Sequence, residues 1–593
     1  MNLSKSDYML GKSCLTKLFY KKNNYSSLDD TNEYLQYLAE GGYIISKLAT
    51  LYFPEGIIIN TKNLDHAIAR TEEYLDNDQC ILFEATIQAS DKIVAVDILV
   101  KEGDTINIIE VKSKGYSSEK GLTEFKDQIE DVAFQKLVIA EAFPNAIINT
   151  YLFVPNKDKR TNIDNLNSMF SINNREILNG FKSIDVTFTG DVNKIIEDDL
   201  MIKIDISYEV NQLLGEVKSN SEKFIESLLS NENPAPELSK KCFTCEYNVK
   251  EGKSGYAECW GNHQLPDHHL KDVYQFTRKV AYIDDAIKSN RLSMFDIPLD
   301  ILSGSYRDRQ IIQIENTRTG SEWTSNKLGK IIDGFDYPLH FIDFETVVTA
   351  LPYHKNMKPY EMSAFQWSCH SIMKQGDDPI HKEWINTEPE FPSFKFAKTL
   401  KDQIGYSGTV FMWATHENTT LKNIFSQMEE YSYPDKELEN WLNYIIRFDN
   451  DDESPLVDMN KLTLENYFHP LMKGKTSIKK TLPAVLASNI SGRTVRWLKE
   501  FSSIIDLYSQ DSKGQIENPY KNLPDIDING QAVNVSDGTG AMIAYNEMLY
   551  GKFKVTELSK QYEKSLLNYC KLDTLAMVII WEHWNQRINK KQK

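Results

Sequence analysis

The stretch "HFIDFET", residues 340–346, places two carboxylates in an otherwise apolar run. The apolar residues predict a β-strand with a buried face. Side chains two residues apart on a strand point the same way, so Asp343 and Glu345 share one face. Burying two like charges side by side is costly unless a cation lies between them. A divalent metal is the expected cation; an edge strand with its polar face in water is the alternative.

Further acidic residues follow where they would complete a metal site. Residues 409–421, "TVFMWATHENTTL", read as a buried strand that runs into a polar turn carrying Glu417. Residues 565–584 read as a long, largely apolar helix. Tyr569 and Asp573 lie four residues apart on it, hence on one face. A salt bridge at a helix cap is the alternative explanation for that pair.

The order of these residues resembles the DEDD-type 3′–5′ exonucleases that carry a tyrosine, which have an RNase H-like (DnaQ-like) fold. The resemblance implies that Tyr569 orients the attacking water and that four carboxylates hold two metal ions. The implied metal ligands are Asp343, Glu345, Glu417 and Asp573. That family usually has Asp at the second motif, where this chain has Glu417. The region also resembles an uncharacterised bacterial domain family often fused behind a RecB-like nuclease.

A group of lysines lies between the second and third acidic motifs. Such lysines are expected to contact phosphate, although a solvated loop gives the same pattern. The group consists of Lys473, Lys475, Lys479 and Lys480.

The N-terminal half carries a second set of charged residues on two predicted strands. Residues 93–100, "IVAVDILV", and 105–113, "TINIIEVKS", are joined by the turn residues "KEGD". If the two strands pair as a hairpin, Asp97, Glu110 and Lys112 converge. Two carboxylates can hold Mg²⁺, and a neighbouring lysine can position or activate the attacking water.

This layout resembles the PD-(D/E)XK nucleases. The residues that the resemblance implies for catalysis and metal binding are Glu84, Asp97, Glu110 and Lys112. A helix is predicted at 122–143, and its Gln135 matches a glutamine of RecB-like members. The tyrosine that usually follows four residues later is absent, because position 139 is Ile.

One early cysteine and a late group of three flank this predicted nuclease core. Thiolates select iron–sulfur clusters or zinc. The arrangement resembles the iron–sulfur variety of RecB-like nucleases, which implies a [4Fe–4S] cluster on Cys14, Cys242, Cys245 and Cys259. A zinc site that replaces Cys14 with His263 is the alternative. The remaining cysteines, Cys80, Cys369 and Cys570, are expected to be small buried hydrophobes.

Strands alternate with helices in both halves, which predicts mixed-sheet α/β domains. A chain of 593 residues is too long for one hydrophobic core. We therefore expect a nuclease domain at 1–270, a helical connector at 271–330 and an exonuclease-like domain at 331–593.

The composition, with 41% apolar and 26% charged residues, is that of a soluble globular protein. No apolar run approaches the roughly 20 residues of a membrane span, and the first residues lack the apolar segment of a secretory signal. A cytoplasmic location without membrane contact is therefore expected. The net charge of −18 argues against a surface that coats nucleic acid broadly, but not against a local basic channel.

These patterns predict an enzyme with two nuclease sites, dependent on Mg²⁺ or Mn²⁺, that hydrolyses DNA from ends or single strands. The resemblance implies a role in DNA repair or phage defence. The chain has no P-loop motif, so unwinding would need a partner such as a helicase. The alternatives are an exonuclease that acts on RNA or oligonucleotides, and a non-catalytic nucleic-acid-binding adaptor with degenerate sites.

Overall fold

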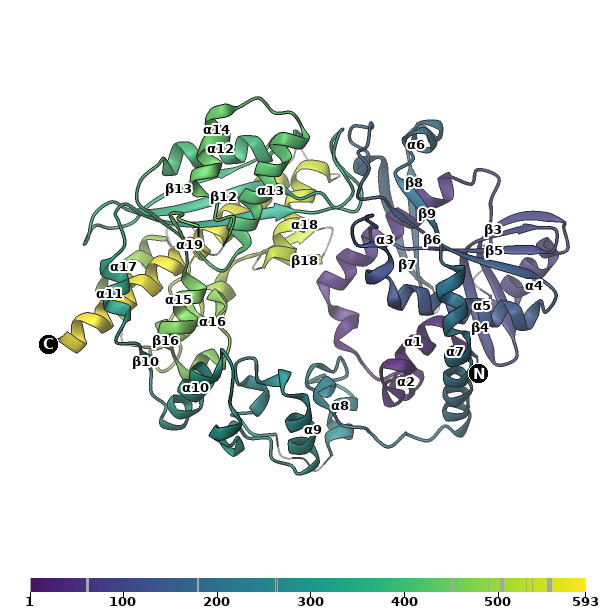
Figure 1. The fold of residues 1–593 in the computed structure, drawn as a ribbon, viewed down its shortest axis with the longest axis horizontal. Coiled ribbons are helices and arrows are strands. Elements are labelled where there is room, and N and C mark those ends of the chain that lie inside the picture. Colours follow the sequence, from purple (N-terminus) through teal and green to yellow (C-terminus); the bar gives the residue numbers. More distant parts are fainter. Residues whose placement is uncertain are drawn as a thin grey trace. The chain divides into compact units, whose positions relative to one another are not determined.

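A computed structural model describes most of the chain, and its residues form two compact α/β units. The first unit comprises Met1–Gly261 with Thr349–Glu361, and the second comprises Asn262–Val348 with Met362–Lys593. Figure 1 shows the helices and strands of each unit along the chain. The residues described are 2–59, 63–178, 181–261, 263, 265–449, 452–488, 490–501, 506–528, 531–535, 537–551 and 557–592.

A mixed sheet of strand order β2-β3-β4-β5-β6-β9 forms the centre of the first unit. Strands β3, β4 and β5 follow one another as antiparallel neighbours, whereas β6 is parallel to β5. The predicted hairpin is confirmed by β4 and β5. The strands are β2 (Ile57–Ile58), β3 (Gln79–Ala89), β4 (Lys92–Glu102), β5 (Thr105–Val111), β6 (Ile147–Pro155) and β9 (Met201–Asp205); β1 (Leu3–Ser4) pairs with β4.

The parallel crossover from β5 to β6 is made by α5 (Lys126–Ala142). This helix was expected from 122, but residues Gly121–Glu124 form a 3₁₀ turn instead. The middle of α5 is buried on nearly every side, from Ile129 to Ile139. Polar residues in that stretch, Gln135 among them, are therefore held inside the unit.

Other helices and one hairpin complete the first unit. They are α1 (Lys5–Ser13), α2 (Leu15–Lys22), α3 (Glu33–Leu51), α4 (Leu64–Leu75), α6 (Val192–Asp198), α7 (Ser207–Ser230) and α8 (Gly255–Trp260), with β7 (Phe170–Leu178) and β8 (Phe181–Phe188). The segment 349–361 packs in the same unit. Leu351 is fully buried in its core, and the Asn165 N–H donates to the Tyr353 carbonyl at 2.7 Å.

The second unit is built on a mixed sheet of order β13-β12-β11-β14-β15. Strand β12 is antiparallel to β11 and to β13, whereas β14 is parallel to both β11 and β15. Strand β11 is thus a central strand, so the edge-strand alternative for "HFIDFET" is wrong. The strands are β11 (Leu339–Val347), β12 (Ser363–Ile372), β13 (Ile380–Ile385), β14 (Thr409–Met412) and β15 (Leu456–Asp458).

Helices cover both faces of this sheet (Figure 1). Ile342 and Phe344 pack against α12 (Ser393–Ile404), α13 (His416–Glu430) and α14 (Lys436–Ile445). Phe341, on the other face of β11, packs with residues of α19 (Glu557–Gln592). Asp343 and Glu345 alternate with Ile342 and Phe344, so they belong to the α19 face.

The other elements of the second unit include the predicted connector, 271–330. They are α9 (Val280–Lys288), α10 (Arg307–Thr319), α11 (Leu328–Asp333), α15 (Met459–Asn466), α16 (Ile478–Leu486), α17 (Gly492–Phe501) and α18 (Gly538–Tyr550), with β10 (Trp323–Thr324), β16 (Tyr467–Phe468), β17 (Asp525–Ile528) and β18 (Gln531–Asn534). Within the described ranges, no helix is both long and apolar enough to cross a membrane.

Candidate functional site

Strand β11 of the second unit presents its two carboxylates to α19. The Cys570 thiol of α19 donates to Asp343 Oδ2 at 3.1 Å and lies 3.4 Å from the Asp343 carbonyl oxygen. A carboxylate oxygen of Asp343, a carboxylate oxygen of Glu345 and the Sγ of Cys570 all lie within 4.8 Å of one another. Glu345 and Cys570 are buried, whereas Asp343 is partly exposed. The predicted shared face of Asp343 and Glu345 therefore holds a compact set of metal-ligating atoms.

Asp573 and Tyr569 extend this set along α19. They lie four residues apart, which on a helix places both side chains on one face. The Asp573 carboxylate accepts hydrogen bonds from the hydroxyls of Tyr569 and Tyr520. Lys479 Nζ in turn donates to the Tyr569 hydroxyl oxygen at 3.2 Å. The third predicted motif thus lies in a buried network of hydrogen bonds.

Glu417 enters the site from the first turn of α13. Its side chain is buried, and Oε2 has no hydrogen-bond partner among the described residues. The pKa of Glu417 lies well above its ordinary value because of burial and the charge of Asp343. A buried carboxylate oxygen without a partner is costly, so this oxygen fits a site that holds a cation.

Electrostatics set this cluster apart from an ordinary salt-bridge network. Burial raises the pKa of Asp343 and Glu345 well above their usual range, and the charge of Asp573 raises both further. The Lys479 ammonium lowers the pKa of all three carboxyls, but one cation does not balance them. Buried carboxylates at this density fit one or more divalent cations.

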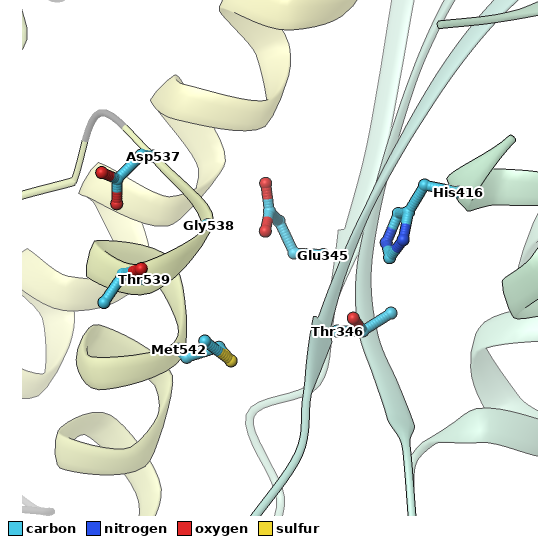
Figure 2. Close-up of a pocket in the computed structure, with 7 residues that line it drawn as sticks. All are labelled: Glu345, Thr346, His416, Asp537, Gly538, Thr539 and Met542. Atoms are coloured by element: carbon cyan, nitrogen blue, oxygen red, sulfur yellow. The ribbon is translucent and has the colours of Figure 1, made fainter. Parts of the chain in front are cut away.

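A cavity of about 370 Å³ adjoins the site. Figure 2 shows the Glu345 carboxylate between β11 and the first turn of α18, where Asp537, Gly538 and Thr539 lie. His416 and Met542 also line the cavity. The site therefore has room for a ligand directly beside one of its carboxylates.

The first unit brings its predicted residues together around Glu110. This side chain is fully buried, and its Oε1 accepts from Lys112 at 2.6 Å. Its Oε2 accepts from the Gln135 amide of α5 at 2.6 Å. Asp97 Oδ2 accepts from the backbone N–H of Val111 at 2.7 Å. The predicted convergence of Asp97, Glu110, Lys112 and Gln135 is therefore present in the structure.

Glu84 lies at the edge of this group. Its backbone has φ +57°, which is uncommon for a residue other than glycine within a strand. The side chain is exposed, yet desolvation raises its pKa, with Glu110 acting in the same direction and Lys5 opposing it. Glu84 is thus near enough to Glu110 for their charges to interact.

Sequence reasoning missed two residues of the first-unit site. Lys5, the first residue of α1, donates to Glu110 Oε1 at 2.9 Å and lies 3.8 Å from Asp131 Oδ2. Asp131 also accepts from Lys112 at 3.1 Å. Asp131 precedes Gln135 by one helical turn, which is a usable signal. Lys5 precedes Glu110 by 105 positions, and no local pattern links them.

The lysines and carboxylates of this site shift one another's titration. Burial opposes ionisation of Glu110, but Lys5 and Lys112 outweigh it and lower the pKa of Glu110 below its ordinary value. Burial and the charge of Glu110 raise the pKa of Asp97. Lys112 thus lies between the carboxylates of Glu110 and Asp131, and Glu110 is near enough to Asp97 for their charges to interact.

The four predicted cluster cysteines gather in the first unit. Cys14 lies between α1 and α2, Cys242 and Cys245 lie at a 3₁₀ turn, and Cys259 lies in α8. All four are half-buried free thiols. Burial raises the pKa of Cys259, and the charges of Cys14 and Cys242 raise it further. The Tyr20 hydroxyl, which lies 3.2 Å from the Cys259 sulfur, lowers it. His263 belongs to the second unit.

The other predictions for cysteines and lysines have mixed outcomes. Cys369 is buried as expected, whereas Cys80 is only half-buried. Cys570 is buried, but it is a hydrogen-bonding member of the acidic site and not a plain hydrophobe. Within the predicted lysine group, Lys479 reaches the acidic cluster.

Part of the chain matches a known family model. Residues 340–477 match the model of a family described as a domain of unknown function (DUF2779). This range contains Asp343, Glu345 and Glu417 and ends before Lys479 and Asp573. The chain matches no curated protein and no solved structure.

Proposed function

We propose that this chain is a nuclease with two metal-dependent active sites, one in each unit, that hydrolyses phosphodiester bonds of DNA. One observation carries the proposal. The two carboxylates of β11 lie together with Cys570, the charges of Asp573 on α19 and Glu417 on α13 act on Glu345, and a cavity lies next to Glu345. Such a cluster is unfavourable without cations and suited to two-metal chemistry.

The sheet arrangements support the motif resemblances. In the second unit, β11 lies centrally with antiparallel strands on one side and parallel strands on the other, as the RNase H-like resemblance implies. In the first unit, three antiparallel strands lead through α5 to a parallel strand; Asp97 and Glu110 lie on the second and third of them, and Lys112 directly follows the third. This agrees with a PD-(D/E)XK nuclease core.

In the second unit, Asp343, Glu345, Glu417 and Asp573 would hold Mg²⁺ or Mn²⁺, which would supply charge for activating water and stabilising the leaving oxygen. The chain's own groups then position the reactants. Asp573 and Lys479 hold the Tyr569 hydroxyl, which orients the attacking water. The cavity beside Glu345 accepts the terminal nucleotide of the substrate.

In the first unit, Asp97, Glu110 and Glu84 would hold the metal. Gln135 orients Glu110 through its hydrogen bond to Oε2. The Lys112 ammonium, held by Glu110 and Asp131, positions or activates the attacking water.

A [4Fe–4S] cluster on the four cysteines of the first unit is part of the same proposal. The donor chemistry supports it, because thiolates select iron–sulfur clusters or zinc, and all four half-buried thiols lie in the first unit. Roles in DNA repair or phage defence, with a helicase as partner, follow from the resemblance.

The direct test is incubation of the full chain with end-labelled single- and double-stranded DNA and RNA, with Mg²⁺, Mn²⁺ or EDTA. We expect DNA to be degraded with either metal and to survive in EDTA. Lys112→Ala should remove one of two cleavage patterns and leave the other. Degradation of RNA alone would favour the RNA exonuclease, and intact substrates in every condition would refute the nuclease proposal.

A further inference from the structure

Cys570 adds a sulfur to the acidic site that a magnesium site does not require. Its thiol lies 3.1 Å from Asp343 Oδ2, and ligand atoms of Asp343, Glu345 and Cys570 form one group within 4.8 Å. Mg²⁺ binds oxygen ligands almost exclusively, whereas thiolates select zinc and related soft cations. The mixed set of sulfur and oxygen donors therefore prefers zinc and related soft cations over Mg²⁺, a preference that the carboxylates alone would lack.

We propose that Asp343, Glu345 and Cys570 bind a thiophilic divalent cation, Zn²⁺ or its analogue Cd²⁺, and that this cation blocks the hydrolytic reaction of the second unit. The blocking rests on the proposed nuclease function. The binding stands on the donor set alone.

The geometry needs only small side-chain adjustments to hold such an ion. Zinc bonds of about 2.3 Å to sulfur and 2.0–2.2 Å to oxygen place tetrahedral ligands roughly 3.3–3.8 Å apart. The ligand atoms already lie within 4.8 Å of one another. Asp343 and Glu345 come from a central strand and Cys570 from a buried position of α19, so the backbone holds the three side chains in place.

Glu417 provides an independent indication of a cation here. Its Oε2 is buried without a hydrogen-bond partner among the residues that the structure describes. Glu417 lies outside the group of three ligand atoms within 4.8 Å, so a water held by its unpartnered oxygen is the fourth ligand of the proposed site.

Occupation by zinc would prevent the two-metal reaction. Zinc forms tighter complexes than magnesium with mixed sulfur and oxygen ligands. It also prefers tetrahedral coordination, whereas Mg²⁺ demands near-octahedral geometry. An ion bonded to Cys570 would engage Asp343, one of the carboxylates that would hold the catalytic ions in the proposed reaction. Trimming would then stop although Mg²⁺ is present in excess.

Binding is tested without any nuclease assay. The full chain is titrated with Cd²⁺ in the presence of Mg²⁺, and the ultraviolet absorption of cadmium–thiolate bonds is followed. Wild type is compared with Cys570→Ser, Cys570→Ala and the control Cys369→Ser. Cys369 is also buried in the second unit, but its sulfur lies near Ser371, at 3.5 Å. The cysteines of the first unit contribute equally in all four proteins.

We expect both Cys570 variants to bind one Cd²⁺ fewer through sulfur than wild type, and Cys369→Ser to bind as many as wild type. Melting curves identify any variant that is unfolded. If one Cys570 variant is unfolded, the other one tests whether Cys570 binds Cd²⁺. Equal cadmium–thiolate absorption in wild type and a folded Cys570 variant would overturn the site.

Inhibition is tested as the ratio of trimming rates with and without Zn²⁺ for each protein at one Mg²⁺ concentration. The Zn²⁺ concentration that halves trimming should rise at least about tenfold in Cys570→Ser, as expected when a metal loses a ligand. It should not change in Cys369→Ser. An unchanged value in Cys570→Ser would overturn the inhibition. If no protein trims any substrate, the nuclease proposal fails while the Cd²⁺ titration still decides the site.

Discussion

At the scale of single residues, the second-unit site is defined by an imbalance of charge. Asp343, Glu345 and Asp573 share the influence of one ammonium group, that of Lys479. The same ammonium donates to Tyr569 and lies 5.0 Å from the centre of its ring. Lys479 therefore both offsets the carboxylates and holds the residue that orients water in the proposed reaction.

Lys479→Met should reduce trimming at the second site by at least about tenfold, because Tyr569 loses its donor and the carboxylates lose their nearby cation. Melting temperature in EDTA should also fall, because the carboxylates then repel one another without compensation. Lys461→Met, at an exposed position of α15, is the matched control. Equal rates for both variants would show that Lys479 has no part in the site.

The raised pKa of the β11 carboxyls predicts how stability depends on pH. Burial and neighbouring charge raise the pKa of Asp343 and Glu345 in the folded chain. Such groups stabilise the fold below their unfolded pKa of about 4, and that contribution is lost as pH rises toward the folded pKa. Melting temperature in EDTA should therefore fall between about pH 5 and pH 8.

Asp343→Asn should make this fall less steep, because it removes one of the titrating charges. Mn²⁺ should flatten the wild-type dependence, because a bound cation stabilises the ionised form. The measurement is thermal unfolding of both proteins across this range, with and without Mn²⁺. Identical slopes in wild type and Asp343→Asn would contradict a partly buried carboxylate whose charge interacts with its neighbours.

Much of the site was predictable at this scale because strand and helix periods are local. Alternation on β11 placed Asp343 and Glu345 together, and helical spacing placed Tyr569 beside Asp573. Tyr520 and Lys5 carried no such signal, because each reaches its carboxylate from a distant segment. The role of Cys570 was also missed, since a lone cysteine on an apolar helix resembles core packing.

At the scale of elements, the four cysteines lie on segments from the two ends of the first unit, which the proposed cluster would join. Cys14 lies at the N-cap of α2, where no side chain caps the helix, and Cys259 lies in the short helix α8. The sequence predicted that these four cysteines form one site. It did not show how far apart their sulfurs lie, because that depends on the packing of α1, α2 and α8.

Anaerobically purified protein should be brown and contain iron and sulfide, because sulfur-to-iron charge transfer absorbs visible light. Cys14→Ser should lose this colour and become more sensitive to proteolysis, because the cluster then no longer joins the two segments. Iron analysis and absorption spectra check the prediction. Colourless protein with one zinc that is retained in Cys14→Ser would instead establish the zinc site.

At the scale of the whole molecule, the chain passes between its two units more than once. It continues from β11 of the second unit into 349–361, which belongs to the first unit, and then returns to β12. The sequence did not indicate this, because an apolar residue such as Leu351 shows that it is buried but not in which core.

If the chain is cut after Gly261, the two fragments should therefore stay associated under native conditions. The fragment 262–593 carries 349–361, whose Leu351 is fully buried in the core of the first unit. Gel filtration of the cut protein should show fragments 1–261 and 262–593 eluting together. Leu351→Asp should release them, because it places a charge in that core. Free separation of the wild-type fragments would contradict the assignment of 349–361.

The central claim is that "HFIDFET" supplies metal-binding carboxylates to a nuclease site. Its most direct test measures 3′ trimming of 5′-labelled single-stranded DNA with Mg²⁺ by two proteins, Lys112→Ala and the double variant Lys112→Ala/Asp343→Asn. The first substitution silences the first-unit site, so any trimming comes from the second. We predict a ladder of shortened products from Lys112→Ala and intact DNA from the double variant, because an amide is a poor Mg²⁺ ligand. The same ladder at the same rate from both proteins would contradict the claim.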